Sequence, residues 1–368
     1  MLEREARFAD RVRGEALAPW GVAELKTLGV RDLIVNACGH ELRWFDLYYM
    51  GAMVQRRDVP ATTPQGEPWL AYYHPAVQQL LIEAASSAGA EVRRGARVRG
   101  LEPGRSPVVT AESNGSVDRI KARLVVGADG RNSLVRRWGG FSSQRDKERH
   151  LFSGVLTDGF DGPDESACFF DPPHGRVSPV FPQGAQRARA YVGYNLAGPH
   201  PSSAEQKFER FVAESVATGV PAEWYANAKS AGPLAAFDGT DDWVDHPYCD
   251  GVVLIGDAAA TSDPTWGQGM SLTLRDVRTL AEFLGGSDDW ESASHAYAAE
   301  HDRYYQTVRT ADDWFSQLFM AMGDAADRRR DAAMPLIASD PIRLIDVAMS
   351  GPEAPADERA RRRFFGEE

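Results

Sequence analysis

The residues best suited to chemistry lie in segment 252–276, which reads VVLIGDAAATSDPTWGQGMSLTLRD. Its first four residues are apolar and predict a buried strand, which delivers Gly256–Asp257 to the strand's carboxyl end. A loop with Pro264 and the sequence Gly267–Gly269 follows, and a helical pattern begins there. A helix N-terminus has unpaired N–H groups and partial positive charge, so it suits an anionic ligand group. Asp257 suits the hydroxyl groups of a ligand arm.

A second acid follows another apolar strand. Segment 124–136 reads LVVGADGRNSLVR, in which the strand leads into Asp129–Gly130 and Arg136 falls one helical turn after Ser133. From that helix, the guanidinium could reach an anionic group of a ligand. The alternative is an ordinary strand-to-helix turn in which Asp129 caps the helix. The similar segment at 252–276 favours ligand binding.

Two further features are weaker taken alone. Arg11 and Arg13 stand two apart in an extended segment, so both side chains point the same way and could clamp a phosphate or line a flat ligand. Taken alone, the two arginines are better explained as part of a charged stretch that is exposed to solvent. His74 precedes a predicted helix, where ligand contact and helix capping are equally open.

Together these segments resemble the FAD-dependent aromatic hydroxylases, the p-hydroxybenzoate hydroxylase-like monooxygenases. In that family the Asp matched by Asp257 holds the ribityl chain of FAD, and the proline and Gly-x-Gly loop lies beside the isoalloxazine ring. The segment matched by residues 127–136 contacts FAD and its pyrophosphate. The resemblance places the Arg11–Arg13 segment along the flavin, and it places Glu3 and His74 at the adenosine half. The cofactor-binding residues it implies are Glu3, Arg4, Arg11, Arg13, His74, Asp129, Gly130, Arg136, Gly256, Asp257, Pro264, Gly267, Gln268, Gly269 and Met270.

The chain also departs from the family pattern. Ala260 stands where a histidine is common, Asp263 precedes a single proline, and Trp266 either narrows the space over the flavin or only packs the loop. The family begins with a strand and Gly-x-Gly-x-x-Gly, whose backbone N–H groups approach the pyrophosphate. That motif is absent from this sequence. We therefore expect an N-terminally incomplete FAD-binding unit with low FAD affinity.

The elements that must position these residues predict an α/β fold with three parts. Residues 1–150 and 246–290 form a Rossmann-like FAD-binding domain with a parallel sheet, and include helices near 18–29 and 75–88 and a hairpin turning at Asn114-Gly115. Residues 151–245 form an interleaved antiparallel-sheet substrate domain, interrupted by a helix near 203–218 that is capped by Ser202 or Ser203. Residues 291–368 form a helical C-terminal segment and tail. Its apolar stripe is Tyr304, Val308, Ala311, Phe315, Leu318 and Met322.

Bulk composition sets limits on the partners. The 368 residues carry a net charge of −12, which argues against a nucleic-acid or anionic-membrane partner. The chain has no apolar run of about 20 residues, and its three cysteines lack metal spacing, so we expect a cytoplasmic protein without an integral membrane segment or metal.

The resemblance implies hydroxylation of an aromatic or polyketide-like small molecule with NAD(P)H and O2, through a flavin C4a-hydroperoxide. The middle sheet would then floor the substrate pocket, and candidate lining residues are Phe170, Val180, Phe181, Tyr191 and Tyr194. No substrate acid or base is identifiable. Two alternatives remain: a flavin-dependent reductase or halogenase of the same fold, and a non-catalytic remnant unable to retain FAD. The halogenase is weakened because no two of the nine tryptophans form a Trp-x-Trp pair.

Overall fold

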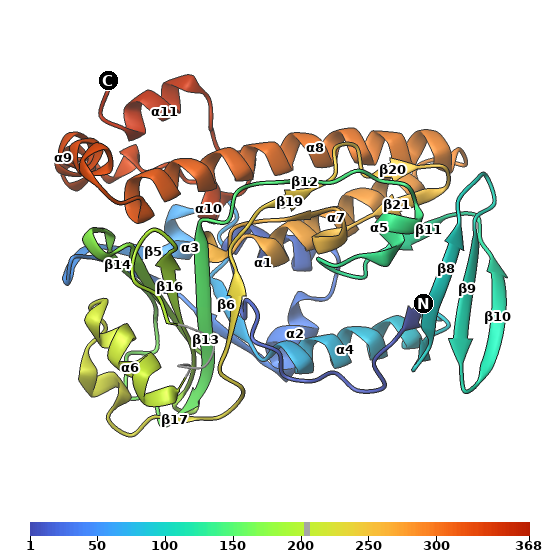
Figure 1. Ribbon diagram of the computed structural model, residues 1–368, viewed down its shortest axis with the longest axis horizontal. Helices are drawn as coiled ribbons and strands as arrows, with labels where there is room; N and C mark the ends of the chain where they lie inside the picture. Colours follow the sequence, from blue (N-terminus) through green and yellow to red (C-terminus); the bar gives the residue numbers. More distant parts are fainter. Residues whose placement is uncertain (202–206) are drawn as a thin grey trace.

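The computed structural model describes residues 1–201 and 207–368, and its largest element is an eight-stranded sheet (Figure 1). The strand order is β17-β13-β16-β15-β14-β4-β5, with β18 also paired to β13. Its strands are β4 (Trp44–Tyr49), β5 (Ala52–Asp58), β13 (His150–Asp158), β14 (Ser166–Asp171), β15 (Arg176–Pro182), β16 (Arg187–Asn195), β17 (Lys229–Ser230) and β18 (Ala235–Asp238). The alternating segments of the middle region thus form the predicted sheet.

This sheet also takes strands from outside the middle region. Residues 44–58 supply β4 and β5, although we expected from the sequence that residues 1–150 belong to the FAD-binding domain. Strand β14 pairs with β4 in parallel, from Ser166 opposite Phe45 to Phe170 opposite Tyr49, whereas the other pairs in this sheet are antiparallel. The run WFDLYY of β4 is rich in aromatic residues that a sheet can bury, and the Tyr48 ring stacks on Phe169 with centroids 4.2 Å apart. Pairing between segments so distant in the chain cannot be predicted from the local sequence pattern of either segment.

The two strands that precede the acids lie side by side. Strand β11 (Val125–Gly127) pairs in parallel with β21 (Val252–Leu254), and β20 (Tyr248–Cys249) joins the other edge of β21. The parallel arrangement expected from these apolar runs is therefore confirmed. Because both strands run the same way, Asp129 and Asp257 emerge at the same edge of the sheet.

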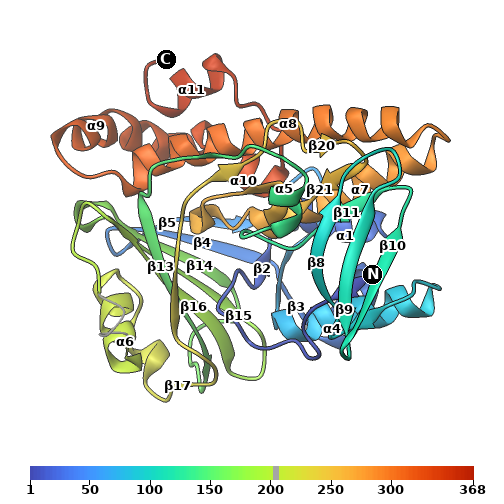
Figure 2. The same ribbon diagram turned by 45° about the vertical axis from the view of Figure 1, so that its right-hand side comes forward.

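A second parallel pair lies apart from the first. Strand β1 (Leu2–Glu3) pairs with β7 (Arg93–Arg94), and within the described part of the chain this pair and β11–β21 belong to separate sheets. Figure 2 shows both groups at the end of the molecule that carries the hairpin strands. The remaining strands are β2 (Ala16–Leu17), β3 (Gly39–Leu42), β6 (Trp69–Tyr72), β8 (Arg97–Glu102), β9 (Val108–Ser113), β10 (Ser116–Lys121), β12 (Gln144–Arg145), β19 (Asp242–Trp243) and β22 (Ala260–Thr261).

The predicted hairpin is present. Strands β9 and β10 pair antiparallel around Asn114 and Gly115, which have φ values of 51° and 79°. Both central residues of such a turn need positive φ, which asparagine and glycine adopt readily.

Long helices cover the sheets on one side. Helix α7 (Gly269–Gly285) packs between α1 (Pro19–Thr27) and α8 (Trp290–Phe315), which runs along the long axis of Figure 1. The predicted apolar stripe of α8 is buried from Tyr304 to Leu318, but a π-helical turn at Ser316–Met320 ends its regular spacing and leaves Met322 half-buried. The other helices are α2 (Arg31–Ala37), α3 (Val59–Thr62), α4 (His74–Ser87), α5 (Leu134–Trp138), α6 (Phe208–Ala217), α9 (Asp324–Ser339), α10 (Val347–Ser350) and α11 (Glu358–Phe364).

The C-terminal tail packs against the helical layer. Phe364 is fully buried, and its ring meets Phe315 edge-on at 5.5 Å. Helix α6 corresponds to the helix expected near 203–218, and its suggested caps Ser202 and Ser203 lie outside the described residues.

Candidate functional site

Asp257 lies in a tight turn at the end of β21. Gly256 has a φ of 58°, and its backbone N–H donates to the carboxylate of Asp276 at 2.6 Å. Asp276 is buried on α7 and also accepts the hydroxyl of Tyr304. This acid on the next helix therefore fixes the turn that presents Asp257.

The carboxylate of Asp257 has no partner of its own among the described residues, since no hydrogen bond or ion pair within 4 Å reaches it there. Burial raises its pKa above the usual value, and the charges of Arg13 and Arg131 partly offset that effect. A poorly solvated carboxylate without partners is costly, and donors from a ligand would lower that cost. The position suits ligand hydroxyl groups.

The loop after Asp257 leads directly into α7. Residues Pro264–Trp266 form one 3-10 turn, Gly267 follows in the left-handed region with a φ of 68°, and α7 begins at Gly269. This α-helix of 17 residues directs the unpaired N–H groups of its first turn toward the loop. The predicted glycine loop and helix start are thus in place, with Met270 partly buried in the first turn.

Gln268 has a different environment from the one the resemblance implies. Its side chain accepts from the indole of Trp20 at 2.9 Å and donates to the carbonyls of Trp266 and Ala348, the second at 3.1 Å. Gln268 is buried and links α1, the loop and α10. Its side chain is therefore occupied by the protein, and any contact it makes with a cofactor would come from its backbone.

Asp129 stabilises the start of a helix. Its carboxylate accepts the backbone N–H groups of Leu134 at 2.7 Å and Val135 at 3.1 Å, and the hydroxyl of Ser133. The N-cap residue of α5 is Ser133, whose hydroxyl accepts the backbone N–H of Arg136 at 2.8 Å, so Asp129 supports the helix start from outside the N-cap position. Gly130 follows Asp129 with a φ of 81°.

Arg136 is likewise held by protein groups. Its guanidinium lies 3.3 Å from a carboxylate oxygen of Asp242 and donates to the carbonyl of Arg131 at 2.8 Å. These partners tie α5 to the strand that carries Asp242. Reaching an anionic ligand would require Arg136 to leave them.

The N-terminal residues separate into two groups. Arg4 and Arg11 are exposed and pair with Glu5 at 3.0 and 2.9 Å, and Glu3 accepts the Glu5 backbone N–H at 2.7 Å. Arg13 is exposed too, but its charge acts on both Asp257 and His74. Of the two arginines, Arg13 is the one the structure brings toward the Asp257 site.

His74 begins α4 and is buried. Burial, together with the charges of Arg13 and Arg189, lowers its pKa to about 4, so the imidazole is neutral near pH 7. Its buried Nδ1 atom has no hydrogen-bond partner within residues 1–201 and 207–368. Its backbone N–H donates to the buried carboxylate of Glu15 at 2.9 Å. A neutral ring with an unsatisfied nitrogen fits a ligand contact as well as a structural role.

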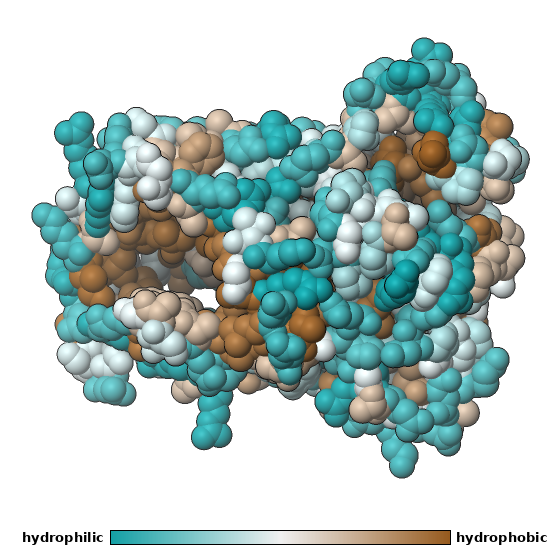
Figure 3. Space-filling view, turned by 180° about the vertical axis from the view of Figure 1, so that it is seen from behind, coloured by the Kyte–Doolittle hydropathy of each residue, from teal (hydrophilic) through white to brown (hydrophobic). Residues whose placement is uncertain are grey.

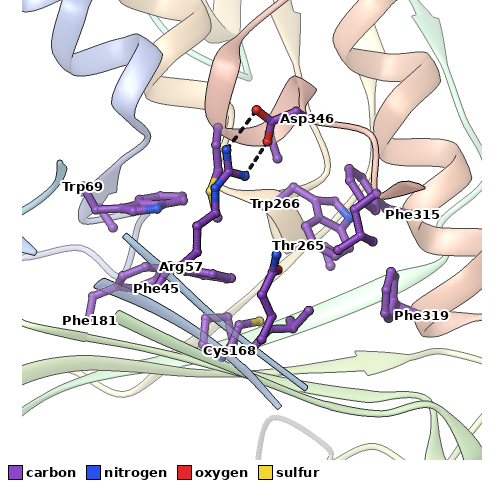
Figure 4. A pocket seen from close by; sticks show the side chains of 18 of the residues that line it. Phe45, Arg57, Trp69, Cys168, Phe181, Thr265, Trp266, Phe315, Phe319 and Asp346 are labelled. Atoms are coloured by element: carbon purple, nitrogen blue, oxygen red, sulfur yellow. Dashed lines mark hydrogen bonds and ion pairs between the residues drawn. The ribbon is translucent and has the colours of Figure 1, made fainter. Parts of the chain in front are cut away.

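Beside the Pro264–Gly267 loop lies a cavity of about 670 Å³. In Figure 4, Trp69, Phe45 and Phe181 lie on one side, Trp266, Phe315 and Phe319 on the other, and Cys168 lies on the sheet below. Two of the five predicted lining residues, Phe181 and Tyr191, line this cavity. Val180 and Tyr194 belong to the core cluster on the opposite side of the sheet, and Phe170 stacks behind Trp266 at 5.2 Å.

Trp266 both lines the cavity and packs the loop. Its ring stacks on Phe315 with centroids 4.1 Å apart, and its buried indole nitrogen has no hydrogen-bond partner among the described residues. Trp266 therefore packs the loop and also borders the cavity.

The C-terminal segment closes the cavity, a role that the sequence did not indicate. Residues 341–349 contribute Ile342, Leu344, Ile345 and Met349 to the lining. Asp346 in this segment receives two hydrogen bonds from Arg57 on β5, at 2.5 and 3.1 Å (Figure 4). No motif marks residues 341–349, because their role arises from packing against elements far away in the chain.

An acid at the end of a parallel strand, a glycine loop at a helix start and an adjoining cavity define an α/β protein that binds a nucleotide cofactor. The FAD binding domain family matches residues 1–311, and the chain belongs to this family. FAD is its cofactor, and the α/β fold and the family resemblance inferred from the motifs are confirmed.

Several individual proteins are similar to this chain. Digeranylgeranylglycerophospholipid reductase 1 of Methanopyrus kandleri is 28% identical over 242 residues, which cover 62% of this chain and 61% of the relative. 6-Methylpretetramide 4-monooxygenase of Streptomyces rimosus is 27% identical over 371 residues, covering 93% and 83%. The crystal structure of p-nitrophenol 4-monooxygenase PnpA from Pseudomonas putida DLL-E4 superposes with a TM-score of 0.75 at 20% identity, covering 92% and 87%.

The residues present fit one half of FAD. The unpartnered carboxylate of Asp257, the start of α7 and the aromatic cavity suit the ribityl chain and the flavin ring. For the pyrophosphate the sequence offers no Gly-x-Gly-x-x-Gly turn, and its one Gly-x-Gly stands at the flavin loop.

Two kinds of feature, a membrane-spanning helix and a metal-binding cluster, are not found among the described residues. Across residues 1–201 and 207–368, no helix has the length and apolar character needed to cross a membrane. In the same ranges no three His, Cys, Asp or Glu side chains gather as a metal site would require.

Proposed function

We propose that this protein is an FAD-dependent monooxygenase that hydroxylates an aromatic or polyketide-like small molecule, using NAD(P)H and O2. The observation that carries the proposal is the aromatic cavity directly beside the Pro264–Gly267 loop. Similarity to a monooxygenase over 93% of the chain supports it. The chain matches between 47% and 66% of the length of three digeranylgeranylglycerophospholipid reductases.

In this proposal Asp257 accepts hydrogen bonds from the ribityl chain, and the first turn of α7 lies beside the flavin ring, where its N–H groups stabilise negative charge. Arg13 compensates the charge of Asp257, and His74 contacts the adenosine half. When bound, FAD takes electrons from NAD(P)H and supplies the oxygen-transfer chemistry. The cavity walls hold the ring substrate and exclude water. Glu3, Arg4, Arg11, Asp129, Gly130 and Arg136 remain proposed cofactor contacts.

The test is product analysis under labelled oxygen. The FAD-loaded protein is incubated with NADPH, ¹⁸O2 and a panel of phenols and aromatic polyketides, and products are analysed by mass spectrometry. The proposal expects one ¹⁸O atom in the product and NADPH oxidation that depends on substrate. NADPH oxidation that yields only hydrogen peroxide across the panel would contradict it.

A reductase is the second candidate, and the similarity to digeranylgeranylglycerophospholipid reductases favours it. An apolar cavity also suits an isoprenoid chain. The same mass measurement separates the two functions, because a reductase adds two hydrogens to a double bond and needs no oxygen. The flavin absorbance of the purified protein tests the remaining alternative, a remnant that cannot retain FAD.

A further inference from the structure

The charged side chains around the cavity are paired with other side chains of the protein. Arg57 is bound to Asp346, and Asp58 accepts from Arg43 at 2.7 Å. Glu15 is fully buried against Arg189 at 2.8 Å. The charge of each of these groups is balanced by its partner. None of them therefore presents an unpaired charge to a substrate in the cavity.

Thr265 has a different arrangement. It lines the cavity within the loop that the proposed function places beside the flavin. Its hydroxyl donates to a carboxylate oxygen of Asp263 at 2.5 Å, and its backbone N–H donates to the same oxygen at 3.0 Å. Since the only hydroxyl proton is committed to Asp263, the oxygen of Thr265 has lone pairs left and no proton to donate.

Asp263 is held as an acceptor by its surroundings. It is 1% exposed, and its second carboxylate oxygen lies 2.5 Å from Nδ1 of His150, which is equally buried. Burial acts to raise the pKa of Asp263, but His150 and Thr265 outweigh it and the pKa lies below its usual value. An ionised carboxylate accepts only, so it fixes the direction of the Thr265 hydroxyl.

Neighbouring acids do not compete for this role. Asp241 accepts the backbone N–H of Asp263 at 2.7 Å, and burial together with the charge of Asp263 raises the pKa of Asp241 to about 7. Burial and the same neighbours raise the pKa of Asp312 as well. The negative charge of this cluster therefore rests first on Asp263, beside His150.

We infer that Thr265 selects substrates that carry a hydrogen-bond donor, a phenolic hydroxyl or an aromatic amine, and accepts that donor through its oriented hydroxyl oxygen. Asp263 and His150 are the positioning residues that hold the hydroxyl in this direction. The inference rests on the proposed function, in that the aromatic ring of the substrate occupies the cavity beside the loop. A substrate with an ether oxygen at the same place has no proton to donate, so its lone pairs would face and repel those of the Thr265 oxygen.

The test compares 4-phenylphenol with 4-methoxybiphenyl, which share the aromatic rings and differ in the donor. Binding of each to the protein in saturating FAD is measured by isothermal titration calorimetry. The wild type is expected to bind the phenol about fivefold more tightly, the size of one net hydrogen bond. Thr265→Val removes the preference, and Thr265→Ser keeps it.

Two further variants complete the design. Asp263→Asn loses the charged acceptor, so the Thr265 hydroxyl is no longer fixed and the phenol preference falls toward one even if Thr265→Val does not fold. Thr62→Val is the matched control: Thr62 also lines the cavity, but its hydroxyl donates to the backbone carbonyl of Asp58 and accepts from Arg57, and the preference is expected to stay.

The outcomes separate the two claims. A phenol preference that persists in both Thr265→Val and Asp263→Asn overturns the inference and leaves the aromatic site standing. If neither probe binds the wild-type protein, the aromatic cavity of the proposed function fails, and the inference fails with it.

Discussion

The flavin-ring side of this molecule and its nucleotide side are built differently. On the ring side, the middle sheet, the Pro264–Gly267 loop and residues 341–349 enclose a cavity. On the nucleotide side, β1–β7 and β11–β21 are separate sheets, and Val126 on β11 is 44% exposed. Figure 3 shows hydrophobic side chains around a hollow at the end of the molecule that carries β8–β10. The two sides therefore offer a cofactor very unequal contacts.

The difference has a physical basis. The ring side is formed by packing between distant segments, and the charged side chains that line its cavity are paired with other side chains. The nucleotide side has apolar surface and strand edges without partners among the described residues, which cost stability and favour association. We expect most of the FAD binding energy to come from the ring and ribityl contacts.

The largest expected effect on FAD binding comes from Asp257. In Asp257→Ala the ribityl hydroxyls lose a charged acceptor, and FAD affinity is expected to fall about 100-fold, since a hydrogen bond to a charged group contributes about 1.5–3 kcal/mol. Quenching of flavin fluorescence on titration measures this. An unchanged dissociation constant for FAD would show that Asp257 does not contribute to FAD binding.

The matched comparison is Asp129→Asn, at the same edge of the parallel strands. Because the carboxylate of Asp129 holds two backbone N–H groups at the start of α5, this change is expected to lower the free energy of unfolding by about 1 kcal/mol. Because these protein groups already occupy the carboxylate, flavin affinity is expected to fall less than in Asp257→Ala. A loss of flavin affinity as large as that of Asp257→Ala would contradict this difference between the two acids.

Asp241 is expected to make stability depend on pH. Its pKa is about 7 in the folded protein and about 3.8 when unfolded, so the folded state holds the extra proton. Stability then falls as the pH rises from about 4 to 7, because each pKa unit corresponds to about 1.4 kcal/mol of differential stability. Asp241→Asn removes this cost and should raise the free energy of unfolding by up to about 4 kcal/mol at pH 8.

Urea denaturation at pH 5 and pH 8 measures the effect, with Asp245→Asn at an exposed position as the control. A gain of equal size at both pH values would contradict the account, because it would not depend on ionisation of Asp241.

The smallest expected effect concerns the closure of the ring-side cavity. Arg57 and Asp346 are 16% and 35% exposed, and solvent weakens their attraction. Arg57→Met is expected to lower stability by about 1 kcal/mol and to loosen residues 341–349, measured by hydrogen exchange of that segment. Protection equal to the wild type would show that apolar contacts alone hold the segment.

The sequence predicted the parts of the site that depend on local patterns. The apolar runs, the two acids and the glycine loop indicated β11, β21 and the start of α7, because each signal is contained in one short segment, 124–136 or 252–276. It did not predict that β4 and β5 join the middle sheet, nor that residues 341–349 close the cavity. Those features depend on contacts between distant segments, as does the pairing of His150 with Asp263.

Arg136 and Gln268 illustrate the same limit inside the motifs. Both residues fit the family pattern, yet the partners of their side chains come from other parts of the chain, such as Asp242 and Ala348. A motif fixes the backbone path through its local conformation, whereas the tertiary fold decides what each side chain touches.

The most direct test compares riboflavin with FAD. Riboflavin carries the ring and the ribityl chain but no pyrophosphate or adenosine. If the described residues bind mainly the ring half, the 368-residue protein should bind FAD at most about tenfold more tightly than riboflavin, and Asp257→Ala should weaken both equally. If the protein bound FAD more than about 1000-fold more tightly than riboflavin, equivalent to about 4 kcal/mol, this account would be contradicted. That result would show that the protein also binds the pyrophosphate and adenosine of FAD strongly.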